Sequence, residues 1–458
     1  DWVGAFKDGL CVGSTKWTGE HTTIPVMGDD GHGYTDGYML PGESPTFMVY
    51  DASEDDMFTV YPYMADGDLA FSLYNWVSIE LLLPEHSHFE RQLVMGANLI
   101  SFYVLPLEST IDTVFESCEE SFASGGNPPF ARVITESKAA YYDPETDEWI
   151  GSLQYIEFDK GYWVIANSDC DLSMVGFNYN PSLEYTLHMG ANLISFPAEG
   201  AISITDAFSD EIESKIEGIF SEGNAANNSE NGWMGSLLSF SGGNGYWLIM
   251  RDNMSFTYNF SNYISISDFG CMDIEASNYN SNATINGNCE YIPPDLFLFN
   301  QSTYQSAYYF ENVTINGISL ESEDWLGAFN GTVCVGARKW DTSQCSSGLC
   351  EVIAYGEDDW TFGYLMNGDI PSFKIYDASA NIYYDAVPSQ EFPWSMLSFN
   401  FADNLDTIVE GCMDDTACNY NPDANVEGGC IYNLDCAGVC GGDAEYDNCD
   451  VCDDDPSN

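Results

Sequence analysis

Acidic and amide side chains recur at short spacing in two similar segments, 270–291 and 411–432, and in the stretch 433–458. The segments read GCMDIEASNYNSNATINGNCEY and GCMDDTACNYNPDANVEGGCIY. Calcium takes about six to eight oxygen ligands from flexible loops, so this pattern predicts calcium sites. The candidate ligands are Asp273, Asn278, Asn280, Asn282, Asp414, Asn419, Asn421 and Asp423 in the segments, and Asp443, Asp447, Asp450, Asp453, Asp454 and Asp455 in the stretch.

Other interpretations of these residues stay open. None of the three stretches has the EF-hand spacing with its terminal Glu. Solvated acidic turns, with Asn residues in left-handed conformations, are the alternative for 270–291 and 411–432. The stretch 433–458 has little apolar content, so we expect metal or disulfides to order it. Zinc on Cys436, Cys440, Cys449 and Cys452 is a further option, but the Asp-rich setting favours disulfides with calcium.

Cysteines occur in pairs that are present or absent together between duplicated parts of the chain. Cys118 and Cys170 occur in one copy of a repeated module, and the matching regions of the other copy, FSDEIESK and MRDNMSF, lack both. A bridge between them would contribute about 4 kcal/mol by loop entropy. The segments 270–291 and 411–432 are too short for a core and need a staple. The predicted disulfides are Cys118–Cys170, Cys271–Cys289, Cys345–Cys350 and Cys412–Cys430.

The other cysteines are less constrained. Cys11 and Cys334 are single in their modules, which predicts buried thiols. The pairing of Cys418 with the cysteines of 433–458 is left open. Fifteen cysteines in total indicate an oxidising, extracellular setting, cell-surface or secreted.

Motifs for catalysis are lacking. The sequence has no GxSxG, HExxH or Walker motif. Carboxylate pairs exist throughout so acidic a chain and therefore do not discriminate. The acid pairs at 29–30 and 358–359 are expected to be surface turns, and His86 and His88 to lie in an exposed linker rather than to hold a metal. We therefore expect a protein without enzyme activity.

Exposed aromatic side chains are the remaining source of function. Flat indole faces can stack on sugar rings, which makes surface glycans candidate partners. We expect burial for Trp17 and Trp340, which recur in duplicated modules, and for Trp149 and Trp233, which precede a shared GSL motif. The complete set of candidate tryptophans is Trp17, Trp76, Trp149, Trp233, Trp340, Trp360 and Trp394.

The charge of the chain restricts its partners. Seventy-three acidic residues against 11 basic ones give a formal net charge of -62, which excludes nucleic acid and anionic membrane surfaces as partners. Screening by salt or bound divalent cations would reduce the self-repulsion. The sequence has no apolar run of about 18 residues, so we expect no membrane span.

One duplication sets the organisation of the chain. DWVGAFKDGLCVGSTKW at residue 1 recurs as DWLGAFNGTVCVGARKW at residue 324. The later copy is preceded by LFLFNQSTYQSAYYFENVTINGISLESE, whose aromatic and β-branched residues predict strand. The earlier copy has no such lead, so we expect its first module to lack one or two strands. Runs such as FMVYDAS, MFTVYPYM and LAFSLYNWVSIELLL predict the strands that it has.

A second duplication lies between these copies. GANLISF at 96–102 and 190–196 is followed in each case by GSL and GYW, which predicts two copies of one β module. In the second copy Ile204, Phe208, Ile212, Ile216 and Ile219 have helical spacing, with Thr205 as cap, so we expect one short helix per copy.

The fold class is therefore predicted to be all-β, with β-sandwich-like modules in series and small units stapled by disulfides and calcium. The predicted modules are 1–84, lacking its lead strands; 91–180 and 185–262, the GANLISF copies; 270–291, a small Cys/Asn-rich unit; 296–403, the complete copy of the first module; 411–432, the second small unit; and 433–458, a Cys/Asp-rich tail.

The small unit GCMD..ACNYNPDA...GGC.Y and the tail DCAGVCGGDAEYDNCDVC resemble repeats of very large secreted and cell-surface proteins of aquatic bacteria. The tail is also similar to thrombospondin type 3 calcium repeats, although its Asp spacing departs from that pattern. The two larger modules resemble β-rich modules of the same bacterial proteins. The resemblance implies an extracellular, multi-module surface protein and no enzyme activity.

Three functions follow from these observations. The first is a calcium-stabilised subunit of a bacterial surface fibre, polymerised when a strand of another copy completes the first module. The alternative source of this strand is an upstream part of the same polypeptide, and the sequence does not separate the two. The second is a glycan-binding adhesin. The third is a non-catalytic region of a larger secreted protein.

Overall fold

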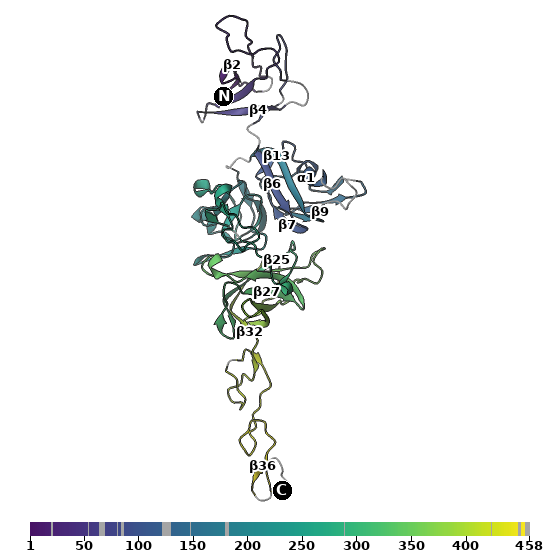
Figure 1. Cartoon of the computed structure of the whole chain (residues 1–458), viewed down its shortest axis with the longest axis vertical. Coiled ribbons are helices and arrows are strands. Elements are labelled where there is room, and N and C mark those ends of the chain that lie inside the picture. Colours follow the sequence, from purple (N-terminus) through teal and green to yellow (C-terminus); the bar gives the residue numbers. More distant parts are fainter. Residues whose placement is uncertain are drawn as a thin grey trace. The chain divides into compact units, whose positions relative to one another are not determined.

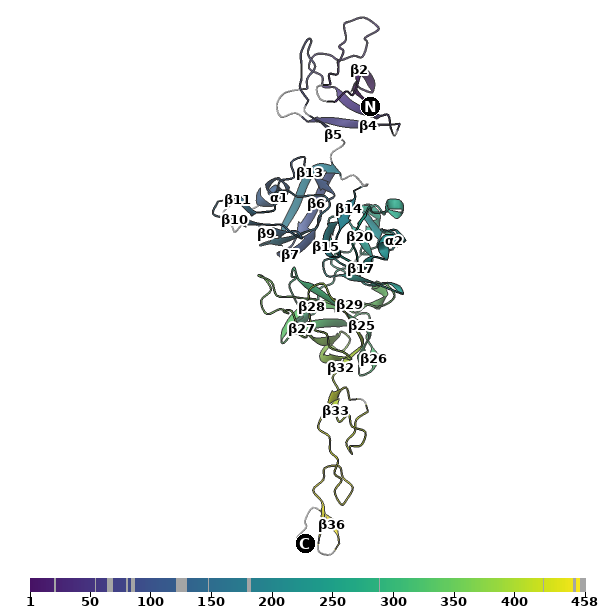
Figure 2. The ribbon, with the colours of Figure 1, turned by 180° about the vertical axis from the view of Figure 1, so that it is seen from behind.

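The computed structural model describes residues 1–19, 22–53, 55–63, 69–79, 81–83, 87–120, 130–146, 148–178, 183–287, 289–422, 424–447 and 450–453. Strands dominate its regular structure, which confirms the all-β class (Figures 1 and 2). Two compact units divide the chain. One comprises Asp1–Glu90, Val104–Glu108 and Ser173–Asn178, and the other comprises Arg91–Tyr103, Ser109–Leu172 and Tyr179–Asn458. No helix among the described residues has the length and apolar character needed to cross a membrane.

Residues 1–84, here called the first module, form one antiparallel sheet in the order β2-β1-β3-β4-β5. Its strands are β1 (Trp2–Lys7), β2 (Leu10–Lys16), β3 (Thr46–Asp51), β4 (Asp56–Tyr63) and β5 (Leu81–Leu83). Asp8 and Gly9 both have positive φ, at 49° and 83°, and this tight turn joins β1 to β2. The core is small and consists of Ala5, Val12, Met39, Phe47 and Val60.

The two GANLISF modules have the same strand order. The first sheet runs β11-β10-β9-β12-β7 and the second β19-β18-β17-β21-β15. The strands of the first are β7 (Gly96–Ile100), β9 (Phe130–Ile134), β10 (Ala139–Asp143), β11 (Glu148–Gly151) and β12 (Tyr162–Ala166). Those of the second are β15 (Gly190–Ser195), β17 (Ile216–Phe220), β18 (Ala225–Ser229), β19 (Gly232–Gly235) and β21 (Gly245–Met250).

Smaller sheets accompany these two. Their strands are β6 (Ser87–Leu93), β13 (Cys170–Asn178) and β8 (Val104–Leu105) in one, β14 (Tyr185–Leu187) and β22 (Met254–Phe256) in another, and β16 (Ala201–Ser203) and β20 (Ser239–Ser241) in a third.

Each GANLISF module has one α-helix, but the helix of the second copy is shorter than its sequence indicates. The helices are α1 (Ile111–Glu120) and α2 (Asp210–Glu213). Ser209, not Thr205, is the N-cap of α2, and Ile216 already begins β17. The five apolar residues with helical spacing pack in a single core cluster. Their spacing therefore reflects one shared buried side rather than a continuous helix.

The complete module, 296–403, is organised around an eight-stranded sheet in the order β26-β25-β32-β31-β30-β27-β28, with β29 paired to β25. Its strands are β25 (Gln305–Ile315), β26 (Ile318–Ser319), β27 (Trp325–Asn330), β28 (Val333–Lys339), β29 (Glu351–Tyr355), β30 (Ser372–Asp377), β31 (Ile382–Pro388) and β32 (Phe399–Thr407). Its core is continuous with residues of both GANLISF modules, including Trp163, Leu193 and Phe220.

The small units and the tail contain short two-stranded ladders. The strands are β23 (Phe269–Gly270) and β24 (Ile285–Asn286), β33 (Glu410–Gly411) and β34 (Val426–Glu427), and β35 (Glu445–Tyr446) and β36 (Cys452–Asp453). Short 3-10 turns lie at Phe260–Asn262, Ile266–Asp268, Asp295–Phe297 and Thr342–Gln344.

The disulfides bear out the sequence comparison. Cys118–Cys170, Cys271–Cys289, Cys345–Cys350 and Cys412–Cys430 are all present as predicted. Cys418–Cys440 and Cys436–Cys452 answer the pairing that the sequence left open, while Cys449 lies outside the described residues. Six disulfides are typical of an oxidising, extracellular environment.

Candidate functional site

The first module and the complete module share the same strand register, so equivalent positions can be assigned. Trp2 pairs with Lys16 and Phe6 with Cys11, as Trp325 pairs with Lys339 and Phe329 with Cys334. A bulge follows Ala5 and Ala328 in the same place. The two modules therefore differ in what surrounds this common sheet.

In the complete module, β25 fills a position between two other strands. It pairs antiparallel with β29 and parallel with β32. The Tyr308 and Phe310 rings lie 5.7 Å and 5.1 Å from the Phe373 ring. Phe310 also lies 6.5 Å from the indole of Trp340, which is 5% exposed. The strand thus supplies both a ladder and part of the core.

The first module contains the counterparts of both neighbours of β25. A Cβ on Gly13 would meet the carbonyl oxygen of Pro25 at 1.8 Å, as one on Gly336 would meet that of Ile353, so 23–27 corresponds to β29. Pairing of β4 with β5 corresponds to that of β31 with β32, which makes Leu82 equivalent to Leu405. Residues 76–79 therefore correspond to 399–402 of β32.

Neither counterpart forms a ladder in the described part of the first module. Residues 22–27 and 75–79 have no strand assignment, and β5 is confined to Leu81–Leu83. The prediction that LAFSLYNWVSIELLL (69–83) forms a strand is therefore wrong for most of its length. The physical reason is pairing: in the complete module 399–402 bond to β25, and no described strand takes that place here.

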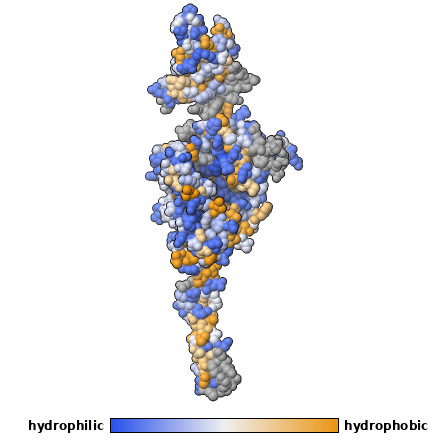
Figure 3. Space-filling view, in the orientation of Figure 1, coloured by the Kyte–Doolittle hydropathy of each residue, from blue (hydrophilic) through white to orange (hydrophobic). Residues whose placement is uncertain are grey.

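Apolar side chains are exposed along this open edge. Trp17, equivalent to Trp340, is 49% exposed, and Trp76 is 83% exposed. Burial of Trp17 was therefore a wrong prediction, whereas burial of Trp340 was correct. Hydrophobic residues accordingly reach the surface of the first module (Figure 3). An unpaired edge with exposed aromatic residues is a site for pairing with another strand.

The two single cysteines differ in the same way. Cys334 is buried as predicted, but Cys11 is exposed, so that prediction was wrong. In the complete module Phe297 packs with Trp325, Phe329 and Cys334 in one cluster. No described residue of the first module takes the place of Phe297, so its cysteine has no cover.

The oxygens predicted to bind calcium take part in hydrogen bonds within their own small units. Asp273 accepts from Tyr291 Oη at 2.7 Å, and Asp414 from Tyr432 Oη at 2.8 Å. Asn278 accepts from the Glu290 amide. These bonds close the turns of each unit and match the acidic-turn alternative.

Further bonds of the same kind involve the remaining candidates. The Asn280 side chain accepts from the Asn282 amide, and that of Asn419 accepts from the Ile431 amide. Asn421 has a partner as well, and its Cβ lies against Gly411.

In the tail, Asp447 is buried and accepts from the Val451 amide at 2.8 Å, whereas Asp443 and Asp450 are exposed. Asp423, Asp454, Asp455 and the Asp453 side chain lie outside the described residues. Among the described His, Cys, Asp and Glu groups, only Cys412, Glu427 and Cys430 bring three ligand atoms within 4.8 Å, and both sulfurs belong to a disulfide. No calcium cage is assembled from these side chains, so calcium stays a prediction.

The other tryptophans fall into two groups. Trp233 and Trp394 are buried, and Trp394 donates its indole N–H to the Ala354 carbonyl, which removes it as a sugar platform. Trp149 is half-buried among Phe115 and Phe130. Trp360 stays 47% exposed next to the exposed Phe362. His88 is exposed as expected, but it lies in β6 rather than in a linker, because this segment pairs with β13, and His86 lies outside the described residues.

The acid pair at 358–359 is more than a surface turn. Asp358 Oδ2 accepts from Ser302 Oγ, the Thr303 amide and Thr303 Oγ1 at 3.0–3.2 Å, and so anchors the chain that leads into β25. Hydrogen bonds to these groups hold the pKa of Asp358 below its usual value, against the opposing effect of burial. Sequence analysis missed this role because the partners lie about 55 residues away along the chain.

Two buried glutamates join neighbouring modules and were also missed. Glu351 of β29 is fully buried, accepts from the Ala225 and Ser236 amides at 3.0 Å, and pairs with Arg338. Glu222 accepts from the Leu99 amide and pairs with Arg91 at 3.6 Å. Burial raises the pKa of both carboxyl groups, that of Glu222 to about 7.

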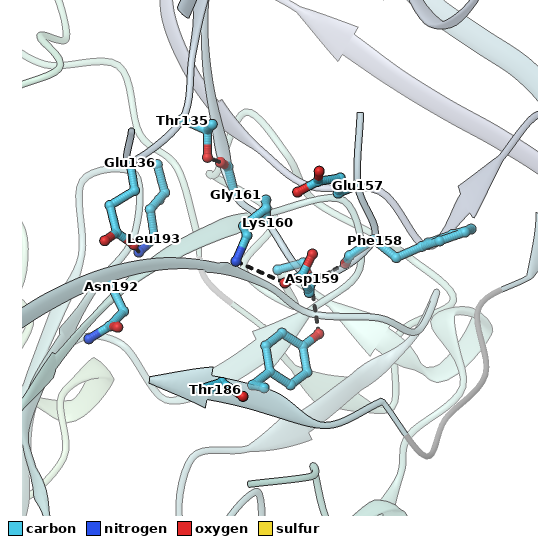
Figure 4. A network of polar contacts seen from close by, with 12 residues as sticks. Thr135, Glu136, Glu157, Phe158, Asp159, Lys160, Gly161, Thr186, Asn192 and Leu193 are labelled. Atoms are coloured by element: carbon cyan, nitrogen blue, oxygen red, sulfur yellow. Dashed lines mark hydrogen bonds and ion pairs between the residues drawn. The ribbon is translucent and has the colours of Figure 1, made fainter. Parts of the chain in front are cut away.

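A hollow of about 170 Å³ lies between the GANLISF modules. Figure 4 shows its polar lining, with Glu136 near Leu193 and Lys160 bonded to Asp159. Glu136 also accepts from His188 Nε2 at 2.5 Å, and this bond raises the pKa of His188. The charged groups are paired with one another, which suits a module junction.

Comparison of the chain with protein-family models found no match, and a search of curated proteins gave none.

Proposed function

We propose that this protein is an extracellular, non-enzymatic structural subunit of a surface fibre. Its first module accepts a strand from a neighbouring copy, and calcium adds stability to the small units and the tail. One observation carries the proposal: 23–27 and 76–79 of the first module are the counterparts of two strands that hold β25 in the complete module, and neither belongs to a ladder in the part of the chain that the structure describes. A strand added there would gain ladders on both sides.

The chemistry of the edge supports an interchain partner. Exposed aromatic residues at a sheet edge favour association, and few monomeric proteins leave them uncovered. The complete module supplies a working example of the same sheet with its extra strand in place. Disulfides stabilise secreted proteins in an oxidising, extracellular environment, which is consistent with a long-lived assembly.

Assembly of the full chain tests this function. Sedimentation velocity across a range of concentrations should show multimers that grow with concentration. Trp17→Glu should reduce this assembly, whereas Trp360→Glu, which alters a tryptophan of similar exposure on the complete module, should not. A chain that stays monomeric at every concentration, or that assembles equally well as Trp17→Glu, would reject the proposal.

Calcium has its own test. Chelation should lower the melting temperature and the protease resistance of 270–291, 411–432 and the tail, because a bound ion stabilises the folded state by mass action. Unchanged melting and proteolysis after chelation would remove calcium from the proposal and leave strand complementation in place.

A glycan-binding adhesin is the second candidate, favoured by Trp360 and Phe362, which lie two residues apart in one loop and are both exposed. A glycan array should then show binding that Trp360→Ala removes and Trp394→Ala does not remove selectively, since Trp394 is buried. No binding across a broad array would reject this function.

A further inference from the structure

The segment that completes the later copy does more than add a strand. Residues 291–315, here called the lead segment, run from Tyr291 through the turn Asp295–Phe297 into β25. Its first part covers a pocket and its second part forms the ladders. The first module shows the surfaces for both parts, which defines the chemistry of the missing occupant in more detail than a strand alone.

The pocket is aromatic. In the complete module the Phe297 ring is fully buried and lies 5.6 Å from the Phe329 ring in an edge-to-face arrangement. A Cβ on Gly327 would meet the Phe329 ring at 2.9 Å and the Phe297 ring at 3.1 Å, so glycine at this position makes room for both rings. Trp325 and Cys334 complete the pocket. Here Trp325 is 8% exposed.

The first module repeats this pocket without its plug. Trp2, Phe6 and Cys11 stand at the positions of Trp325, Phe329 and Cys334, and Gly4 stands at that of Gly327. Trp2 is 47% exposed and Cys11 is an exposed free thiol. We call Trp2, Gly4, Phe6 and Cys11 the plug pocket. The plug pocket has Gly4 at the position of Gly327, and no described residue of the first module takes the place of Phe297 there.

A cation beside the pocket is complementary to an aromatic occupant. Lys339 lies 4.6 Å from the Tyr291 ring centre and pairs with Glu323 and Glu275. Its equivalent, Lys16, is exposed and makes no ion pair among the described residues. Glu323 and Glu275 lie outside the lead segment, so the contact that the lead segment itself brings to this cation is the Tyr291 ring. An exposed cation at this place therefore favours a partner that brings an aromatic ring.

A second anchor recognises hydroxyl residues. Asp358 holds Ser302 and Thr303 of the lead segment. Its equivalent in the first module is Asp30, because Asp30 and Asp358 begin matching loops in which Thr35 and Thr361 bond back to them. Asp30 is exposed, and among the residues that the structure describes its Oδ2 accepts a hydrogen bond only from the nearby Tyr34 hydroxyl. That exposed oxygen is within reach of a newly bound chain.

We infer that the first module binds an extended segment with the chemistry of Tyr291–Ile315: an aromatic plug over the plug pocket, then Ser-Thr at Asp30, then a strand rich in aromatic residues between 23–27 and 76–79. The strand runs antiparallel to 23–27 and parallel to 76–79, as β25 does to β29 and β32. This inference rests on the proposed acceptor role of the first module and specifies what it accepts.

Protection of Cys11 in the full chain tests the inference. The probe is a synthetic peptide of residues 291–315, and the readout is the alkylation rate of each thiol resolved by peptide mass. Without peptide, Cys11 should react far faster than the buried Cys334. At ten times its dissociation constant the peptide should slow Cys11 about tenfold, in proportion to occupancy, and leave Cys334 unchanged.

Matched peptides separate the plug from the strand. A peptide with Phe297→Ala should bind more weakly and leave Cys11 reactive, whereas one with Leu298→Ala, which alters an exposed neighbour, should behave like the original. In the full chain, Lys16→Gln should weaken binding by roughly threefold to fivefold, and Lys215→Gln, remote in the second GANLISF module, should not.

Three results would overturn the inference: a peptide that does not bind, a bound peptide that leaves Cys11 at its original rate, or equal protection by the Phe297→Ala peptide. The outcomes are separable from those for the fibre. Protection by the peptide without self-assembly supports this inference and rejects the fibre. Self-assembly that leaves Cys11 reactive supports the fibre and rejects this inference.

Discussion

Replacing Phe297 by alanine should give the complete module the same open pocket that the first module has. The Phe297 ring is fully buried and contacts the rings of Phe329 and Tyr383 at 5.6 Å and 5.5 Å. Truncating a buried phenylalanine to alanine costs about 3–5 kcal/mol. The β ladders of β25 do not include Phe297, so the module should stay folded while its pocket opens.

The thiol beneath the ring reports this opening. Burial raises the pKa of Cys334 to about 11 from an ordinary value of 9.0. Return to the ordinary value would increase the thiolate fraction at pH 8 about a hundredfold, because each pKa unit is a factor of about ten. Gain of access adds to this factor, so the alkylation rate of Cys334 should rise at least about a hundredfold.

The assay is alkylation of the full chain at pH 8, with each cysteine followed separately by peptide mass. Leu298→Ala is the matched control, since Leu298 is the adjacent residue and is 58% exposed. It should leave Cys334 slow. If Phe297→Ala raises the Cys334 rate by only a fewfold, the ring does not cover the thiol and the explanation of the exposed Cys11 fails.

Three further predictions concern carboxyl groups. Burial raises the pKa of Glu222 to about 7, above its ordinary 4.5. The free energy of unfolding should therefore fall by about 2–3 kcal/mol as pH rises from 4.5 to 7. Urea unfolding of Glu222→Gln should show a flatter dependence of this free energy on pH, and an unchanged dependence would contradict the prediction. Glu351→Ala should cost about 3–5 kcal/mol because it leaves Arg338 buried without its partner, and a urea midpoint equal to that of the original chain would refute it. Hydrogen bonds, above all from Thr416, hold the pKa of Asp414 below its usual value, so its stabilisation is present at neutral pH and lost as pH falls through the folded pKa. The protection factors of amides in 411–432, corrected for the intrinsic pH dependence of exchange, should therefore fall in acid, and Asp414→Asn should remove that pH dependence. A fall that persists in Asp414→Asn would contradict the assignment.

Duplication made much of the fold predictable. Paired presence and absence located the bridge Cys118–Cys170, because two cysteines that are gained together are easily explained as partners. Alternation of apolar residues located β3 and β4. These features depend on one segment or on a comparison between copies, and both are visible in a sequence.

Contacts between distant segments were not predictable in this way. Residues 76–79 have strand composition but form no ladder in the described structure, since a strand requires a partner as well as propensity. The spacing of Ile204 to Ile219 predicted one short helix over these residues, yet β17 begins at Ile216 because tertiary pairing with β21 prevails. Nothing in the sequence indicated that the hydrogen-bond partners of Glu351 lie in another module.

The candidate site was predictable in outline only. The equivalence of the two copies was apparent from the comparison of Asp1 with Asp324, but the exposure of Cys11 and Trp17 depends on which residues lie against them in the fold. The candidate calcium ligands show that spacing alone does not identify a metal site. Side-chain oxygens spaced for a metal can instead accept hydrogen bonds that close a turn, as Asp273 does from Tyr291. Spacing identifies donors, and only the fold determines what they bind.

Hydrogen–deuterium exchange of the full chain tests the acceptor edge most directly. Peptides that cover 22–28 and 75–79 should exchange quickly in the isolated chain, whereas the equivalent 351–355 and 399–402 should be protected by their ladders with β25. Adding the 291–315 peptide should protect 22–28 and 75–79 and leave 351–355 unchanged. Slow exchange at 22–28 and 75–79 before any addition, or no change after it, would contradict an open edge that receives a strand.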